Sequence, residues 1–140
     1  MTVLISPTDD IDACHKLRFT VFCEEQGVDW SLELDDLDAV STHLLATEAG
    51  VPVGTARVFK SGPYAKIGRV CVLPGHRGTG LGAKLIVAAL ELGKTLPDVT
   101  AAKLGAQVQA IGFYEKLGFE ISGPLYDDAG IPHRDMTRPY

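Results

Sequence analysis

The sequence predicts a mixed fold of the α/β class, of the α+β kind, built as a single domain over residues 1–140. Its 140 residues match the length of one ordinary domain. Strand, helix and strand patterns follow one another over residues 65–107, which indicates a β-α-β unit. The patterns before and after this unit are those of hairpins. We therefore expect a mixed central sheet whose N-terminal strands are antiparallel.

The first helix is predicted from a start signal and an apolar stripe. After a short β-type run at residues 3–5, Ser6 stands at an N-cap position, Pro7 in the first turn and Asp9 three residues after the cap. Apolar residues then recur every three or four positions until Gly27 ends the pattern. The stripe consists of Ile11, Cys14, Leu17, Val21 and Phe22, with Arg18 beside it. We expect an amphipathic helix that ends at Gly27.

An acidic segment and two hairpin strands follow this helix. Residues 24–38 hold seven acids, no base and the only tryptophan, so we expect an irregular segment or a weak second helix there. Residues 42–48 and 53–60 are β-type runs around a turn at 49–52, which predicts an antiparallel hairpin. A third strand, 65–73, stops at Pro74, which has no N–H to donate to a sheet.

The second half of the chain alternates between helix and strand patterns. One face of a predicted helix over residues 81–95 is lined by Leu81, Leu85, Ala88, Ala89 and Leu92. The later elements are a strand at 99–107, a helix at 109–117 stopped by Gly118, and strands at 119–125 and 134–139 around a turn at 127–130.

Composition excludes several classes of protein. Thirteen Lys and Arg against 18 Asp and Glu give a formal net charge of −5, which argues against a nucleic-acid-binding face. No apolar run approaches the ~20 residues of a membrane span, and residues 1–5 lack the features of a signal peptide, so we expect a cytoplasmic protein. Three cysteines without a CxxC pair and four scattered histidines indicate neither a disulfide framework nor a metal site.

The charge is divided unevenly along the chain. Residues 1–59 carry three bases and eleven acids, a net −8, whereas residues 60–140 carry ten bases and seven acids, a net +3. Such asymmetry suggests two ligands of opposite sign. Acids crowded on one solvated loop would give the same pattern, so the two interpretations stay open at this point.

A glycine-rich turn separates the strand at 65–73 from the helix at 81–95. Gly78, Gly80 and Gly82 alternate there behind Arg77. Backbone N–H groups at a helix start, together with the helix dipole, suit a phosphate or pyrophosphate, and a close-packed turn is the alternative. Neither the Walker A nor the dinucleotide pattern fits, because Leu81 follows Gly80 and is the only residue between Gly80 and Gly82.

Two motifs stand about thirty residues apart, each on the expected element. Residues 77–82 match the pattern Arg/Gln-x-x-Gly-x-Gly/Ala between a strand and a long helix, and residues 110–119 read AIGFYEKLGF. Together they resemble the GNAT superfamily of acyl-CoA-dependent N-acyltransferases, over residues 1–140 in order. The resemblance implies a GNAT fold with helices on both faces of the sheet, which splays between strands 65–73 and 99–107 to hold the pantetheine arm of acetyl-CoA.

Further stretches resemble one branch of that superfamily. Residues 18–28, the acids Glu33, Asp35, Asp36 and Asp38, and residues 129–136 are similar to the ElaA-like subgroup. Substrates in this subgroup are poorly defined, so the resemblance names the reaction and leaves the acceptor open.

The resemblance implies a set of residues that bind acetyl-CoA, the acyl donor. Val70 and Val72 would offer unpaired strand edges to the pantetheine arm, with Cys71 pointing to the opposite face. The backbone of residues 77–82 would hold the pyrophosphate, with Arg77 as a charge partner. Gln107 retains a side-chain amide where many GNAT proteins have asparagine. The expected set is Val70, Cys71, Val72, Arg77, Gly78, Thr79, Gly80, Leu81, Gly82, Gln107 and Phe113.

The resemblance also places a general acid at Tyr114. A phenol, with a pKa near ~10, can donate a proton to the departing thiolate at neutral pH. The alternative is an aromatic residue of the helix core, since Phe113 and Phe119 flank it.

A proton acceptor is needed as well, because a lysine-like ammonium has a pKa of ~10.4 and must lose a proton before the amine attacks. The candidates are Glu25, Asp36, His43 and His133. Glu25 is the first choice, because it follows the apolar stripe and opens the acidic segment. Asp36, His43 and His133, together with Phe22, are also expected around the acceptor.

We therefore expect an N-acetyltransferase that moves an acetyl group from acetyl-CoA to a primary amine by direct attack in a ternary complex. The acidic half would attract a cationic amine acceptor. Members of the superfamily often form homodimers. The alternatives are a catalytically silent acyl-CoA-binding regulatory module and an enzyme of the acyl-homoserine-lactone synthase type on the same fold. An enzyme that uses the Cys71 thiol is disfavoured, because no histidine lies near it in the sequence.

Overall fold

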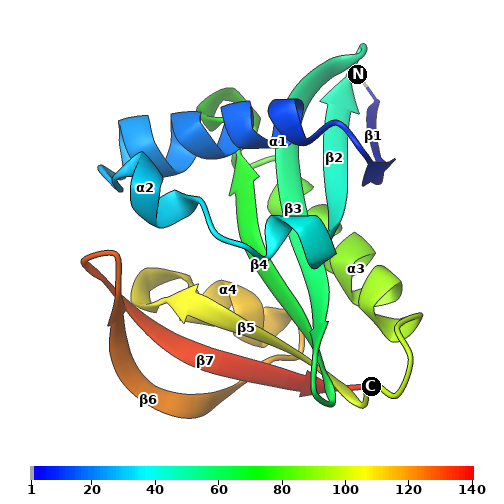
Figure 1. Cartoon of the computed structure of the whole chain (residues 1–140), viewed down its shortest axis with the longest axis vertical. Helices are drawn as coiled ribbons and strands as arrows, with labels where there is room; N and C mark the ends of the chain where they lie inside the picture. The colour runs from blue at the N-terminus through cyan, green and yellow to red at the C-terminus, as the bar shows by residue number, and fades with distance from the viewer. Residues whose placement is uncertain (1) are drawn as a thin grey trace.

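A single sheet organises the computed structural model, which describes residues 2–140 (Figure 1). The strand order is β1-β2-β3-β4-β5-β7-β6. The strands are β1 (Val3–Thr8), β2 (Thr42–Glu48), β3 (Val51–Ser61), β4 (Tyr64–Val72), β5 (Ala101–Gln107), β6 (Glu120–Asp128) and β7 (Ile131–Pro139). β4 and β5 are parallel and every other neighbouring pair is antiparallel. The predicted mixed sheet with a β-α-β unit is confirmed.

Helices cover both faces of the sheet, as predicted. On one face α3 (Leu81–Lys94) contributes Leu85 and Ile86 to the main core, and α4 (Ile111–Lys116) packs at its edge. On the other face α1 (Ile11–Arg18) continues into the π-helical η1 (Phe19–Glu25), and Leu17 and Val21 pack against Cys71. The short α2 (Trp30–Glu33) lies in the acidic segment. Three 3-10 turns complete the chain: η2 (Asp38–Val40), η3 (Pro74–His76) and η4 (Val108–Ala110).

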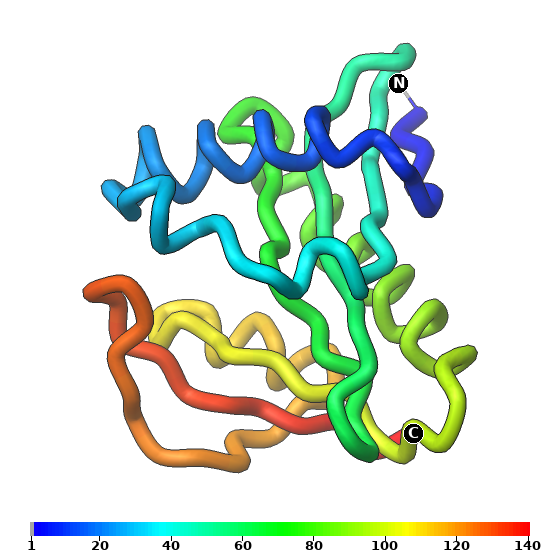
Figure 2. Tube along the Cα trace, viewed as in Figure 1, coloured from blue at the N-terminus to red at the C-terminus, as the bar shows by residue number. Residues whose placement is uncertain are grey.

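The sheet divides where β4 and β5 meet. Their parallel pairing ends at Lys66 and Lys103, although β4 continues to Val72 and β5 to Gln107. Figure 2 shows β2–β4 and β5–β7 diverging from this point. Within residues 2–140, the facing edges of residues 67–72 and 104–107 therefore have no partner strand.

A β-bulge changes which faces of the sheet the side chains at the C-terminal end of β4 point to. Gly68 pairs with Arg57 and Cys71 with Thr55, so Ala56 faces two residues, Arg69 and Val70. The bulge shifts the alternation of side chains by one position. As a result Val70 and Val72 pack toward the α3 face, while Cys71 packs toward the α1 face. Arg69 takes a left-handed backbone conformation, with φ of 50°.

The predicted helix start at Ser6 is wrong. Ser6 and Pro7 belong to β1 and pair with β2, and the helix begins after Asp10, whose carboxylate accepts from the Ala13 N–H. Pro7 is tolerated in a strand because β1 lies at the edge of the sheet. The predicted end is confirmed, since Gly27 follows η1 with a φ of 74°.

Candidate active site

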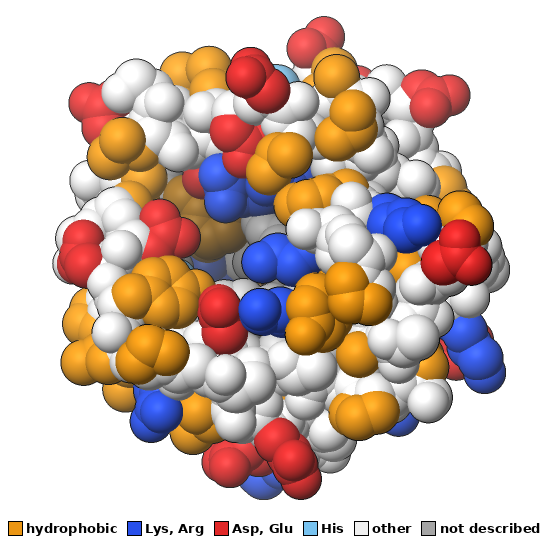
Figure 3. All heavy atoms as spheres, turned by 60° about the horizontal axis from the view of Figure 1, so that its bottom comes forward, with side chains coloured by type: hydrophobic (Ala, Val, Ile, Leu, Met, Phe, Trp, Pro, Cys, Tyr) orange, Lys and Arg blue, Asp and Glu red, His pale blue; other side chains and the backbone are white. Residues whose placement is uncertain are grey.

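A cleft of about 550 Å³ lies where β4 and β5 diverge. Figure 3 shows a hollowed face on which Lys and Arg side chains gather beside hydrophobic ones. Its walls come from η1 and the acidic segment on one side and from the β6–β7 hairpin on the other. The residues that line it include Phe22, Glu25, Gln26, Glu33, Asp35, Arg57, Lys66, Arg69, Val70, Cys71, Val72, Arg77, Gln107, Tyr114, Tyr126, Asp128 and His133.

The glycine-rich turn leads from Arg77, which lines the cleft, into α3. Gly80 is the N-cap of α3 with a φ of 85°, and Gly78 has a φ of 76°, conformations that L residues with side chains rarely adopt. Within residues 2–140, none of the backbone N–H groups of residues 78–82 has an acceptor. The turn therefore fits an anionic group such as a pyrophosphate. Thr79 is held by its hydroxyl, which donates to the His76 carbonyl over 2.6 Å.

The remaining cofactor candidates lie around the same end of the cleft. Val70 and Val72 line it at the free edge of β4. The Cys71 thiol between them is buried, and this burial raises its pKa to about 12. The Leu81 side chain is buried in the core, so only its backbone is available. Phe113 lies outside the lining, 41% exposed, with its ring beside Gly82.

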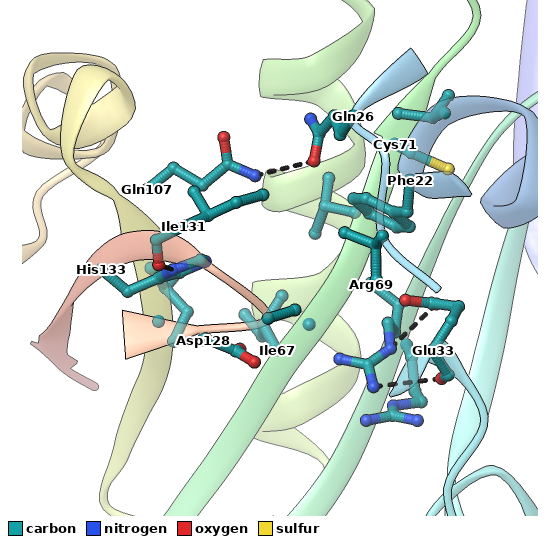
Figure 4. A pocket seen from close by; sticks show the side chains of 18 of the residues that line it. Phe22, Gln26, Glu33, Ile67, Arg69, Cys71, Gln107, Asp128, Ile131 and His133 are labelled. Atoms are coloured by element: carbon teal, nitrogen blue, oxygen red, sulfur yellow. Dashed lines mark hydrogen bonds and ion pairs between the residues drawn. The ribbon is translucent and has the colours of Figure 1, made fainter. Parts of the chain in front are cut away.

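The Gln107 side chain spans the gap between the end of β5 and the loop after η1. Its Nε2 donates to Oε1 of Gln26 over 3.0 Å, which joins the end of β5 to the loop after η1 (Figure 4). Gln109 in turn donates to Oε1 of Gln107. Both ends of the Gln107 amide are therefore hydrogen-bonded, one to Gln26 and the other to Gln109.

Glu25 is engaged by Arg77. Nη2 of Arg77 lies 2.7 Å from Oε1 of Glu25, and Nη1 binds the other carboxylate oxygen. This hydrogen-bonded guanidinium lowers the pKa of Glu25. A carboxylate with a lowered pKa is a weaker base, so the geometry argues against the preferred assignment of Glu25 as the general base.

Tyr114 lies in the cleft between two aromatic rings. Phe113 and Phe119 contact it edge-on, with ring centroids 5.1 and 6.0 Å away. No group among residues 2–140 is hydrogen-bonded to its hydroxyl, and burial raises its pKa. The phenol is therefore protonated and has a proton to give.

His133 also lines the cleft, with a defined tautomer. Its Nδ1 lies 2.7 Å from the Ile131 carbonyl, which can only accept, so Nδ1 carries a proton and Nε2 is the free nitrogen. The ring stacks on Tyr126 with centroids 5.8 Å apart. Tyr126 is held by its hydroxyl, which donates to Oδ1 of Asp135 over 2.9 Å.

The structure does not bring Asp36 or His43 into the cleft. Asp36 is exposed beside the lining residue Asp35. His43 is buried beside a separate pocket, where its Nε2 lies 3.1 Å from the Asp38 carbonyl. Of the four residues expected around the acceptor, Phe22 and His133 line the cleft, whereas Asp36 and His43 do not.

The acidic segment is largely neutralised by arginines. Arg18, 1% exposed, binds Glu33 over 2.8 Å and Asp38 over 2.9 Å. Arg57 binds Asp35 and Asp38. Burial alone would raise the pKa of Asp38, but hydrogen bonds from Arg18, His15 and Arg57 hold it well below its usual value.

The cleft as a whole carries balanced charges. Its lining holds four acids and four bases: Glu25, Glu33, Asp35, Asp128, Arg57, Lys66, Arg69 and Arg77. The acidic half contributes three of these acids, Glu25, Glu33 and Asp35, and each of them is bound to an arginine. The expectation that the acidic half attracts a cationic acceptor is therefore not supported.

Sequence reasoning missed Arg69, Lys66, Tyr126 and Asp128 as residues of the cleft. One signal was present in the sequence, since glycine inside a strand often marks a bulge and Gly68 directly precedes Arg69. Within residues 2–140 no group of three or more His, Cys, Asp or Glu side chains is arranged to hold a metal ion. None of the helices in this part of the chain is long and apolar enough to cross a membrane.

Comparison with known proteins gives one consistent picture. The acetyltransferase (GNAT) domain family matches residues 13–139. A Bacillus subtilis protein assigned as an acetyltransferase is 42% identical over 137 residues, which are 96% of this chain and 92% of its own. Protein ElaA of Escherichia coli is 33% identical over 127 residues, 88% of this chain and 83% of its own.

Solved structures agree. The crystal structure of Escherichia coli ElaA superposes with a TM-score of 0.84 at 27% identity, covering 98% of this chain and 99% of that one. An acyl-CoA N-acyltransferase from Pseudomonas aeruginosa gives a TM-score of 0.88 at 28% identity, with the same coverage of 98% and 99%.

Proposed function

Because this chain belongs to the GNAT acyltransferase family and is ElaA-like, we propose that it is an N-acetyltransferase that uses acetyl-CoA to acetylate a primary amine. The observation that carries the proposal is the row of free N–H groups at residues 78–82, next to a cleft that holds an unengaged Tyr114 hydroxyl. Acetyl-CoA supplies an activated thioester and is consumed as a substrate.

Binding of the acyl donor falls to backbone groups in this proposal. The N–H groups of residues 78–82 receive the pyrophosphate, and the helix dipole of α3 adds partial positive charge there. The free edge of β4 at Val70 and Val72 offers backbone groups to the amides of the pantetheine arm, although the Val72 carbonyl already accepts from Nε of Arg77 over 3.0 Å. A backbone N–H near Val72 would polarise the thioester carbonyl.

Two side chains move protons. His133 takes a proton from the acceptor ammonium at Nε2, directly or through a water, and the resulting amine nitrogen attacks the thioester carbonyl carbon. The new C–N bond forms as the C–S bond breaks, and Tyr114 gives its hydroxyl proton to the departing sulfur. The proton that the nitrogen still carries in excess of the amide passes to the Tyr114 oxygen, directly or through water, which restores the phenol. We assign the base to His133 because its Nε2 is free, whereas Glu25 is bound to Arg77.

CoA release from acetyl-CoA, measured as free thiol with a panel of primary amines, tests the proposal. We expect turnover with at least one amine, together with an acetylated product of matching mass. The variants Tyr114→Phe and His133→Gln should each lower kcat by about 100-fold, the usual contribution of a general acid or base. Calorimetric binding of acetyl-CoA without turnover by any amine would instead identify a silent acyl-CoA-binding module.

A further inference from the structure

Arg69 stands out in the cleft by its backbone and by its free donors. Its left-handed conformation at the bulge is one that residues with side chains adopt only when the surroundings impose it. Nη2 donates to the Glu33 carbonyl and to Oδ2 of Asp35, each over 3.2 Å, and Nε lies 2.9 Å from a Glu33 carboxylate oxygen. Nη1 has no acceptor within residues 2–140, so its two N–H groups are available.

The free charges of the cleft lie on opposite walls. Glu25 is paired with Arg77, and Asp35 with Arg57. Neither Lys66 nor Asp128, both lining residues, has a side-chain partner among residues 2–140. Lys66 and Arg69 come from β4, whereas Asp128 comes from the end of β6, and Figure 4 shows Arg69 and Asp128 on opposite sides of the gap.

We propose that the acceptor is a zwitterion of the amino-acid type, whose carboxylate binds Nη1 of Arg69 and whose ammonium lies toward Asp128 and His133. This inference rests on the proposed function and names the substrate class of the same cleft. A singly charged carboxylate can accept from the two free N–H groups of Nη1. The carboxylates of Glu33 and Asp35, which already share that guanidinium, would repel a dianionic phosphate more strongly than a singly charged carboxylate.

Matched acceptors test the inference. Each of several L-amino acids is compared with its decarboxylated amine and its carboxamide, at fixed acetyl-CoA, by CoA release and product mass. The amino acids should have a kcat/KM higher by about tenfold or more, as expected for a charge-assisted hydrogen bond. In Arg69→Gly this ratio should fall to near one. Glycine suits the left-handed backbone, which keeps the variant folded. Lys94→Gln removes the same charge from the exposed end of α3 and should keep the ratio.

Three results would overturn the inference while leaving the acetyltransferase in place. They are equal kcat/KM values within each matched set, a carboxylate preference that persists in Arg69→Gly, and faster turnover of phosphoethanolamine than of any amino acid. Acetyl-CoA binding without turnover of any acceptor would overturn the proposed function together with the inference.

Discussion

The Arg77 guanidinium lies against the Glu25 carboxylate, with Nη2 2.7 Å from Oε1, although 52 residues separate the two in the chain. The same guanidinium donates from Nε to the Val72 carbonyl over 3.0 Å. Arg77 thus ties the end of η1 to the end of β4, immediately before the glycine-rich turn. An anionic group that binds this turn competes with Glu25 for Arg77.

Replacing Glu25 separates its two candidate roles. In Glu25→Gln, Arg77 loses its charged partner, so we expect acetyl-CoA to bind several-fold more tightly in calorimetry. The value of kcat should fall by less than about tenfold, because loss of a general base costs about 100-fold or more. Glu24→Gln, at the exposed neighbouring acid, is the matched control and should change neither quantity. A hundredfold lower kcat with an altered pH profile would make Glu25 the base after all.

The buried network predicts a strong dependence of stability on Asp38. Asp38→Asn leaves the buried Arg18 with Glu33 as its remaining carboxylate partner. Breaking a buried pair in this way costs about 3 kcal/mol or more. Urea unfolding at pH 7 should show this loss, whereas Asp36→Asn, at an exposed acid, should lie within about 0.5 kcal/mol of wild type.

The Asp38 carboxylate also makes the unfolding free energy depend on pH in the acid range. Its pKa in the folded state lies below the value of about 3.9 expected in the unfolded chain. The stabilisation is therefore complete above about pH 5 and is lost as the pH falls through 4 toward the folded pKa. The difference in unfolding free energy between wild type and Asp38→Asn should shrink over that range. A difference that stays constant down to pH 3 would show that Asp38 is not the titrating group.

Sequence patterns predicted the elements better than the roles of single charges. The glycine-rich turn and the β-α-β unit are predicted from local sequence patterns, and the structure contains both. Tyr114, which belongs to a local motif, lies in the cleft. The ion pairs between arginines and carboxylates join residues 15 to 52 positions apart, so composition could not show that Asp35 is bound to arginines while its neighbour Asp36 is exposed. The sequence could not show for a related reason that His43 lies outside the cleft, because the direction of its side chain depends on the segment around Asp38 that it contacts.

Two helical glycines should respond in opposite ways to alanine. A Cβ at Gly93 would lie 2.6 Å from the Ala65 Cβ and 2.7 Å from the Tyr140 hydroxyl, so Gly93→Ala should destabilise by about 1–3 kcal/mol. A Cβ at Gly112 meets nothing within 4 Å, so Gly112→Ala should stabilise by about 0.5–1 kcal/mol through helix propensity. Equal effects in thermal unfolding would contradict the close packing of α3 on β4.

Burial predicts that the Cys71 thiol is unreactive. Its pKa of about 12 leaves almost no thiolate at pH 8. An excess of iodoacetamide should therefore modify Cys71 only after unfolding, as read by peptide mass, whereas the partly exposed Cys23 should be modified more readily in the folded protein. Rapid modification of Cys71 in the native state would reopen thiol-based catalysis.

A crystal structure with acetyl-CoA bound tests the central claim most directly. The account predicts the pyrophosphate on the N–H groups of residues 78–82, the pantetheine arm along Val70 and Val72, and the thioester sulfur within hydrogen-bonding distance of the Tyr114 hydroxyl. Acetyl-CoA bound elsewhere, or in this cleft with its sulfur out of reach of Tyr114, would contradict it.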